Sequence, residues 1–137
     1  IVKIISAGTA KIQEIVSYDK QPSKGYPLVT VCMDESENDF NSNAMNMRVY
    51  IFRIMIYDQL SNNVDINTWN SAVERAEANL SDIVTEILGV LDTNYTLNSI
   101  VDYVEATPSR WGYLETDKGF CRTAEILLRT HKEYRVI

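Results

Sequence analysis

Reactive and crosslinking residues are scarce in this sequence. It contains two cysteines and a single histidine, His131. One histidine excludes a multi-histidine metal site, and any Ser-His-Asp or Cys-His arrangement would have to rely on His131 alone. Cys32 and Cys121 are far apart, lie in apolar runs and have no second ligand at zinc-finger spacing. We therefore interpret both as small buried thiols and expect no disulfide.

Glycine, proline and long apolar runs are also scarce. The 137 residues include 5 glycines and 3 prolines, and none of the glycines forms a phosphate-binding loop. An apolar run of about 18 residues, long enough to cross a membrane, is missing as well. With 45% hydrophobic residues, the composition is typical of one globular domain, which we place over residues 1–137.

Positive charge is the third shortage. Thirteen Lys and Arg residues stand against nineteen Asp and Glu, which gives a net charge of -6. This balance opposes sequence-independent binding to the phosphate backbones of nucleic acids. The segment Ile1 to Ile15 has neither a basic region nor a continuous apolar region, so it does not resemble a signal peptide, and we expect synthesis in the cytosol.

The first third of the chain shows two periodic patterns. Apolar residues recur at steps of three and four from Ile1 to Val16, which predicts an amphipathic helix over residues 1–17. A polar stretch with Pro22 and Gly25 predicts a loop over residues 18–25. The apolar stretch from Pro27 to Met33 predicts a first strand.

An acidic segment separates this strand from a second. Asp34 to Asn46 is rich in acids and asparagine, which indicates either a long exposed loop or an extended hairpin tip. Met47 to Leu60 alternates as a strand whose two faces are both largely apolar. Such a strand needs cover on both sides.

The remaining chain predicts one helix and two strands. Helical periodicity from Ile66 continues for about 24 residues, or about 36 Å at 1.5 Å per residue. Ile100 to Thr107 and Phe120 to Val136 alternate as strands, and Pro108 to Gly119 interrupts them. The expected order is α-β-β-α-β-β. We therefore predict an α+β fold in which two helices pack on a four-stranded antiparallel sheet.

The acidic segment does not match a calcium loop. In Asp34 to Asn46, Asp39 occupies the place of the turn glycine, and Met45 occupies the place of the bidentate glutamate of an EF-hand. We interpret the segment as a solvated stretch that repels anions or meets a basic partner.

Two other sets of titratable residues are candidates for catalytic groups. Glu115 and Asp117 lie two residues apart just before Gly119 in an expected turn, where surface charge is the simpler interpretation. His131, near the end of the last strand, is interpreted as a partly exposed strand histidine, with a general base as the alternative. We accordingly predict a protein that is not an enzyme and that uses no cofactor and no metal.

One exposed aromatic cluster is expected. Trp111 and Tyr113 lie beside Arg110 in the segment between Pro108 and Gly119. Aromatic residues and arginine are the residue types on which protein interfaces depend most. An interface and a cap over the domain's own core explain the cluster equally well.

Three features together resemble a known family. They are the α-β-β-α-β-β order, the acidic segment after the first strand and the long final strand, which contains the stretch Gly119 to Arg129 (GFCRTAEILLR). This combination resembles the tail terminator (tail completion) proteins of long-tailed bacteriophages and related prophage particles. The resemblance extends over most of the chain as architecture and includes no invariant motif.

The resemblance implies a structural virion protein that acts in the tail and neck after assembly in the host cytoplasm. It implies a hexameric ring that caps the tail tube, binds the tube protein and a neck or head-completion protein, and lets DNA pass through its bore without specific binding. We place the subunit or tube contacts in two segments, Asp34 to Asn46 and Ser109 to Gly119. The candidate contact residues are Asp34, Glu35, Glu37, Asp39, Arg110, Trp111, Tyr113 and Glu115.

Three alternatives stay open. The chain could be another head-tail connector component or a tail tube protein. It could be a small cytosolic α+β enzyme that uses Glu115, Asp117 or His131. It could also be a monomeric adaptor that binds a peptide along a free sheet edge.

Overall fold

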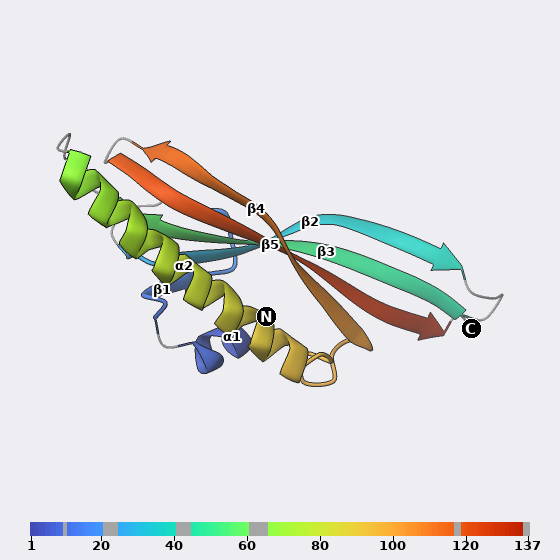
Figure 1. Ribbon diagram of the computed structural model, residues 1–137. Coiled ribbons are helices and arrows are strands. Elements are labelled where there is room, and N and C mark those ends of the chain that lie inside the picture. The colour runs from blue at the N-terminus through green and yellow to red at the C-terminus, as the bar shows by residue number, and fades with distance from the viewer. Residues whose placement is uncertain (10, 21–24, 41–44, 61–65, 117–118, 136–137) are drawn as a thin grey trace.

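Two helices and a five-stranded mixed sheet make up the fold (Figure 1). The computed structural model describes residues 1–9, 11–20, 25–40, 45–60, 66–116 and 119–135. The element order is α-β-β-β-α-β-β. The elements are α1 (Val2–Gly8), β1 (Glu14–Val16), β2 (Leu28–Phe40), β3 (Met45–Gln59), α2 (Ile66–Thr93), β4 (Tyr103–Thr116) and β5 (Gly119–Arg135).

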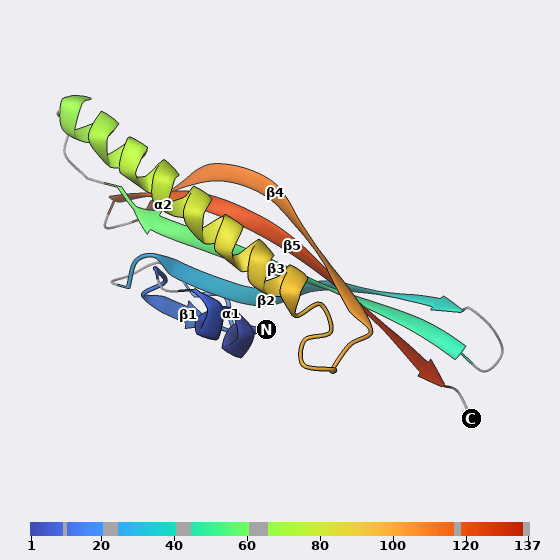
Figure 2. The same cartoon turned by 60° about the horizontal axis from the view of Figure 1, so that its bottom comes forward.

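The strands lie in the order β1-β2-β3-β5-β4. Neighbouring strands are antiparallel except for β1, which runs parallel to β2. Helix α2 lies along one face of the sheet, with α1 beside its C-terminal end (Figures 1 and 2). Strands β2, β3 and β5 continue past the end of α2, and we refer to Asp34–Phe40, Met45–Ile51 and Thr130–Arg135 as the β-arm.

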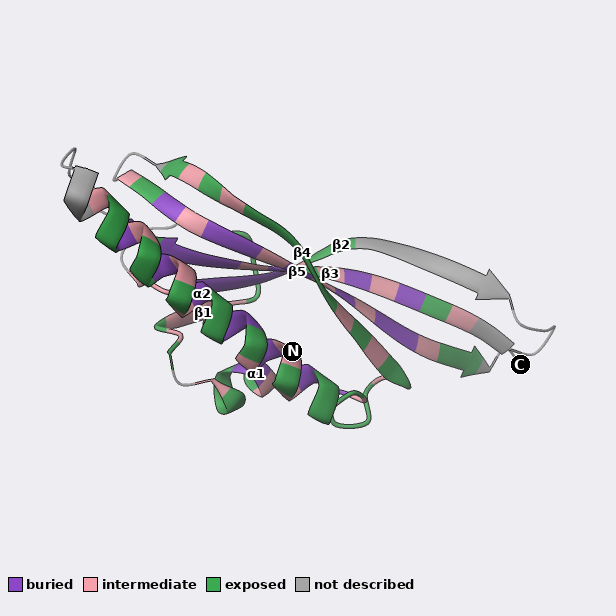
Figure 3. Cartoon of the chain, viewed as in Figure 1, coloured by how far each residue is buried: buried purple, intermediate pink, exposed green. Residues whose placement is uncertain are grey.

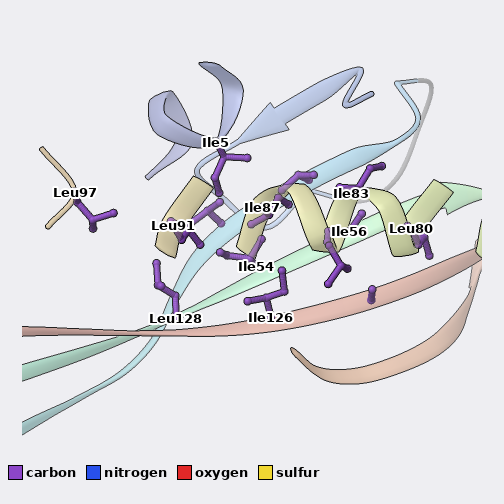
Figure 4. Packing of buried hydrophobic residues seen from close by; sticks show 14 residues of the cluster. Ile5, Ile54, Ile56, Leu80, Ile83, Ile87, Leu91, Leu97, Ile126 and Leu128 are labelled. Carbon is purple, nitrogen blue, oxygen red and sulfur yellow. The ribbon is translucent and has the colours of Figure 1, made fainter. Parts of the chain in front are cut away.

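The main core lies between α2 and the sheet. Every second residue of the central strands and every third or fourth residue of α2 point into it, because those are the repeats that place side chains on one face (Figures 3 and 4). Its buried members are Ile5, Val29, Val31, Ile54, Ile56, Leu80, Ile83, Val84, Ile87, Leu91, Leu97, Ala124, Ile126 and Leu128.

A smaller cluster covers part of the opposite sheet face. Leu28, Tyr57 and Cys121 are buried there, and Tyr26 and Val16 pack against them. The second apolar face that the sequence predicts for Met47 to Leu60 is thus covered near the end of β3 by chain from the β1–β2 connection.

The predicted helix over residues 1–17 is wrong beyond Gly8. Thr9 is extended, with φ −129° and ψ 132°, and its hydroxyl donates to the carbonyl of Ile5 (2.8 Å). The chain then forms β1, in which Ile15 pairs with Val29 of β2. The sheet is therefore five-stranded and mixed, and the predicted four-stranded antiparallel sheet lacks this strand.

The predicted interruption from Pro108 to Gly119 is also wrong, because β4 continues to Thr116. Proline is tolerated here for two reasons. β4 is an edge strand, which leaves one side of its backbone without a ladder to break. In addition, the register shifts between Pro108 and Arg110, as in a β-bulge.

The other predicted elements are confirmed with shifted ends. The strands predicted at Pro27 to Met33, Met47 to Leu60, Ile100 to Thr107 and Phe120 to Val136 correspond to β2, β3, β4 and β5, and the predicted long helix is α2. Of the two interpretations of Asp34 to Asn46, the extended hairpin is confirmed, since β2 continues to Phe40 and β3 begins at Met45.

Two glycines differ in the space around them, which gives a matched test of helix packing. A Cβ on Gly8 would overlap the Cγ2 of Val90, whereas a Cβ on Gly89, in the interior of α2, would meet nothing within 4 Å. We expect Gly8→Ala to lower the free energy of unfolding by about 1–2 kcal/mol. Gly89→Ala should raise it by about 0.5–1 kcal/mol, since alanine favours a helix over glycine. Urea denaturation measures both, and an unchanged Gly8→Ala variant would contradict the close contact of α1 with α2.

Candidate functional site

Neither thiol is activated for catalysis. Cys121 is buried and its Sγ lies 3.5 Å from the hydroxyl oxygen of Tyr26, whereas Cys32 is half-buried. Burial raises the pKa of both thiols, because it disfavours the charged thiolate. The prediction of a buried thiol is confirmed in full for Cys121. Among the described residues, no cluster of three or more His, Cys, Asp or Glu side chains could hold a metal ion.

The raised thiol pKa values predict slow alkylation. Only the thiolate attacks iodoacetamide, so at neutral pH both cysteines should react more slowly in the folded protein than in urea. Cys32 should react first, because Cys121 is 1% exposed. Mass spectrometry of timed samples gives the order, and faster labelling of Cys121 in the native protein would contradict its burial.

His131 is buried, so the predicted partly exposed histidine is wrong. It is 8% exposed, and its ring stacks on Tyr103 with centroids 4.2 Å apart. Its Nε2 lies 3.2 Å from a carboxylate oxygen of Glu105, and its carbonyl accepts a bond from the amide of Asp102 (2.9 Å). All three partners come from β4 or the residue before it, so His131 joins β4 to β5.

The acidic candidates lie on β2 in the β-arm. A carboxylate oxygen of Asp34 is 3.3 Å from Nη2 of Arg53 on β3, in an exposed ion pair. For Glu35, Glu37 and Asp39 the structure describes the backbone, which pairs with β3, and their side chains lie outside the described part. Asp34–Phe40 of the acidic segment therefore forms an extended strand in the β-arm.

The aromatic candidates are fixed on β4 around one arginine of β5. Trp111 is 42% and Tyr113 56% exposed. The guanidinium carbon of Arg122 lies 4.5 Å from the centroid of the Tyr113 ring and 5.9 Å from that of Trp111. Such cation–π contacts hold the rings in place and leave their outer faces in water.

Arg122 is itself fixed by hydrogen bonds to α2 and to the backbone of β4. Its Nε donates to a carboxylate oxygen of Glu77 on α2 (2.6 Å), and its Nη1 donates to the carbonyl of Gly112 (2.9 Å). The Arg122 side chain is 13% and that of Glu77 44% exposed, so a nearly buried guanidinium paired with a more exposed carboxylate supports the exposed rings. Phe120, also exposed, meets Trp69 of α2 edge to face with centroids 5.8 Å apart. We call Trp111, Tyr113 and Phe120 the aromatic patch.

The other two candidates of this segment are exposed on β4. Arg110 pairs in register with Glu125, and Glu115 pairs with Phe120 beside the aromatic patch. Asp117 lies outside the described residues. The segment thus brings Arg110, Trp111, Tyr113 and Glu115 together on one strand, although Asp34 and the β-arm lie elsewhere.

The sequence did not indicate that Arg122, Glu77 and Phe120 belong to this aromatic cluster. Arg122 and Glu77 are 45 residues apart, so no local spacing links them. The pairing of Tyr113 with Arg122 in the β4–β5 register is the signal that would have found the cluster, and it requires the hairpin register to be known.

At both edges of the sheet, strand backbone lies without a partner strand among the described residues. Among the described residues, no strand pairs with the outer side of β4. On the opposite edge, β1 pairs with β2 from Leu28 to Thr30, and no other strand in the described part of the chain pairs with this edge of β2 from Val31 onward. Because β2, β3, β5 and β4 alternate in direction, the two free edges run antiparallel to each other.

No protein-family model matches this chain, and no curated protein sequence matches it significantly. None of the helices in the described residues has both the length and the apolar character needed to cross a membrane.

Proposed function

We propose that this chain is a structural virion protein of the tail terminator type. In this proposal it forms a homohexameric ring that caps the tail tube and joins it to the head-neck connector, and DNA passes through the bore. It acts in the tail and neck of the particle after assembly in the host cytoplasm. Its partners are further copies of the chain, the tube protein and a neck or head-completion protein.

The two free strand edges carry this proposal. A ring of identical subunits needs two different surfaces on opposite sides of each subunit, so that each copy binds the next in the same way. β4 and the outer part of β2 lie at opposite edges of one sheet and run antiparallel. A second copy placed at β4 through its own β2 would continue the alternating strand directions of the sheet, and exposed edges are ready to pair in this way.

Charge supports the passage of DNA without binding. The net charge of the chain is -6, and α2 carries five acidic residues and one basic residue. They are Glu74, Glu77, Asp82, Glu86 and Asp92, and Arg75. Like charge repels the phosphate backbone and keeps DNA free to move.

A role without catalysis agrees with the state of the reactive groups. Burial raises the pKa of both thiols, and the His131 ring is buried in a stack on Tyr103. We accordingly propose no cofactor and no enzymatic activity.

The free edge of β4 also favours a second candidate, a monomeric adaptor that binds an extended peptide by strand addition. The two candidates differ in what the edge binds: another copy of this chain, or a foreign segment. Another head-tail connector component would share the ring but not the binding of tube ends.

The test is the native mass of the purified protein, measured by light scattering after size exclusion, with negative-stain images of the same sample. A closed ring of six copies supports the proposal. If the protein is monomeric, purified tail tubes are added and their ends are imaged. Tubes without caps, together with a monomer in solution, would contradict the proposal and favour the adaptor.

A further inference from the structure

An apolar groove lies at the C-terminal end of α2. It encloses about 540 Å³ between α1, the segment that follows α2, and strands β2 and β3. We call it the apolar groove, and it is lined by Val2, Ile4, Val31, Met33, Phe52 and Ile100, among others. Met33 is 58% and Ile100 64% exposed, so large apolar side chains are left in water here.

The aromatic patch lies far from this groove on the same chain. Phe120 contacts Trp69 in the first turns of α2, whereas the groove lies beside α1 and the residues after Thr93. For Phe120 the separation is most of the length of α2, whose 28 residues span about 42 Å at 1.5 Å per residue. Trp111 and Tyr113 are separated from β2 by strands β5 and β3. Trp111 and Tyr113 of the patch also lie on the edge strand β4, whereas Val31 and Met33 of the groove lie on β2, and Figure 1 shows these strands at opposite sides of β3 and β5. A chain therefore cannot place its own patch in its own groove.

We propose that the aromatic patch of one copy inserts into the apolar groove of the next copy. This inference rests on the ring of the proposed function and identifies the two surfaces that would join its subunits. Each copy carries one patch and one groove, so the contact is head to tail and repeats around a ring.

The size of the groove and the rigidity of the aromatic rings favour the patch as its occupant. A volume of about 540 Å³ is within the range of about 300–1,000 Å³ that is usual for pockets that enclose a small ligand, so it has room for more than one aromatic ring. Aromatic side chains contribute the most area at an interface and lose little conformational entropy there. Because Arg122 holds Trp111 and Tyr113 in place, they would lose even less on binding.

The charges beside the two surfaces are complementary. Glu115 is exposed next to the patch, and it supplies the negative charge there, because the carboxylate of Glu77 is neutralised by its ion pair with Arg122. Lys3 lines the groove, and Nζ of Lys132 donates to the carbonyl of Ile100 at its border (2.7 Å). Arg110 does not oppose this pattern, because its register partner is Glu125 whereas that of Trp111 is Ala124, and consecutive register positions face opposite sides of a sheet.

The test mixes two variants, each of which has lost one surface. The patch variant is Trp111→Ala with Tyr113→Ala, and the groove variant is Met33→Glu with Ile100→Glu. All four side chains are exposed, so both variants should fold, as circular dichroism and urea denaturation can verify. Each variant alone should be monomeric, whereas an equal mixture should give a heterodimer, because one intact patch then meets one intact groove and no further contact is possible.

The readout is the mass by light scattering, in the presence of tail tubes if the wild-type ring requires them. Tyr18→Ala is the matched control, since Tyr18 is 58% exposed and belongs to neither surface, and it should assemble like the wild type. A mixture that stays monomeric, or a patch variant that still forms rings, would overturn the contact and leave the wild-type ring unaffected. If the wild type forms no ring either in solution or on tubes, the proposed function fails and this contact fails with it.

Discussion

Ile87→Ala is expected to lower the free energy of unfolding by about 3–4 kcal/mol, because a buried isoleucine truncated to alanine leaves a cavity as well as losing apolar contact. Ile87 is fully buried in the C-terminal half of α2, among core residues from the helix and the central strands (Figure 4). A domain of this size has a total stability of about 5–15 kcal/mol, so this one side chain carries a large share of it.

Urea denaturation followed by circular dichroism measures this effect. Ser81→Ala is the control on the same helix, since Ser81 is exposed, and it should change the free energy by less than about 0.5 kcal/mol. Equal stability of the Ile87→Ala variant and the wild type would contradict the position of α2 on the sheet.

The second large effect concerns assembly. Under the proposed function the wild type caps tail tubes, and replacing Trp111 and Tyr113 by alanine should abolish capping at the protein concentration that saturates the wild type. Interface residues of this kind contribute about 2 kcal/mol or more each, and about 2 kcal/mol is a roughly thirtyfold change in affinity. Since every subunit contact of a ring would lose both residues, the loss is repeated around the ring.

Titration of tubes with protein, scored by negative-stain images of the tube ends, measures capping. The same variant should keep nearly the stability of the wild type, because each lost cation–π contact to Arg122 is worth about 0.5–1 kcal/mol at an exposed site. Capping at the wild-type concentration would contradict the assignment of these two residues to an interface. A large loss of stability would instead show that they support the fold.

The long elements could be predicted from the sequence because their patterns are long. Met47 to Leu60 keeps its alternation over the whole of β3, and the helical repeat continues through most of α2. The helix predicted over the first 17 residues was too long, because Ile12 and Ile15 keep helical spacing with Ile1, Ile4 and Ile5. Both residues pack on the same core, Ile15 from the short strand β1 and Ile12 from the residues before it. That strand is fixed by its pairing with β2 rather than by a local preference.

The candidate site was predictable in part for a related reason. Trp111 and Tyr113 can be recognised as exposed aromatic residues within their own segment. The burial of His131 depends on Tyr103, and the support of the rings depends on Glu77. Such contacts between distant segments follow from strand register and helix placement, which a single sequence does not specify.

The pairing of β3 with β5 has a consequence for how the chain folds. Met45 pairs with Arg135 at one end and Gln59 with Cys121 at the other, so the centre of the sheet joins segments separated by the whole of α2 and β4. Closing such a long loop costs entropy before any pairing compensates for it, and domains rich in non-local contacts fold slowly. We expect α2 and the local β2–β3 and β4–β5 hairpins to form first and to meet in a late, rate-limiting step. Until that step, β3 and β5 each have an unpaired edge that can bind another chain, so the chain is most exposed to aggregation before this central pairing is complete.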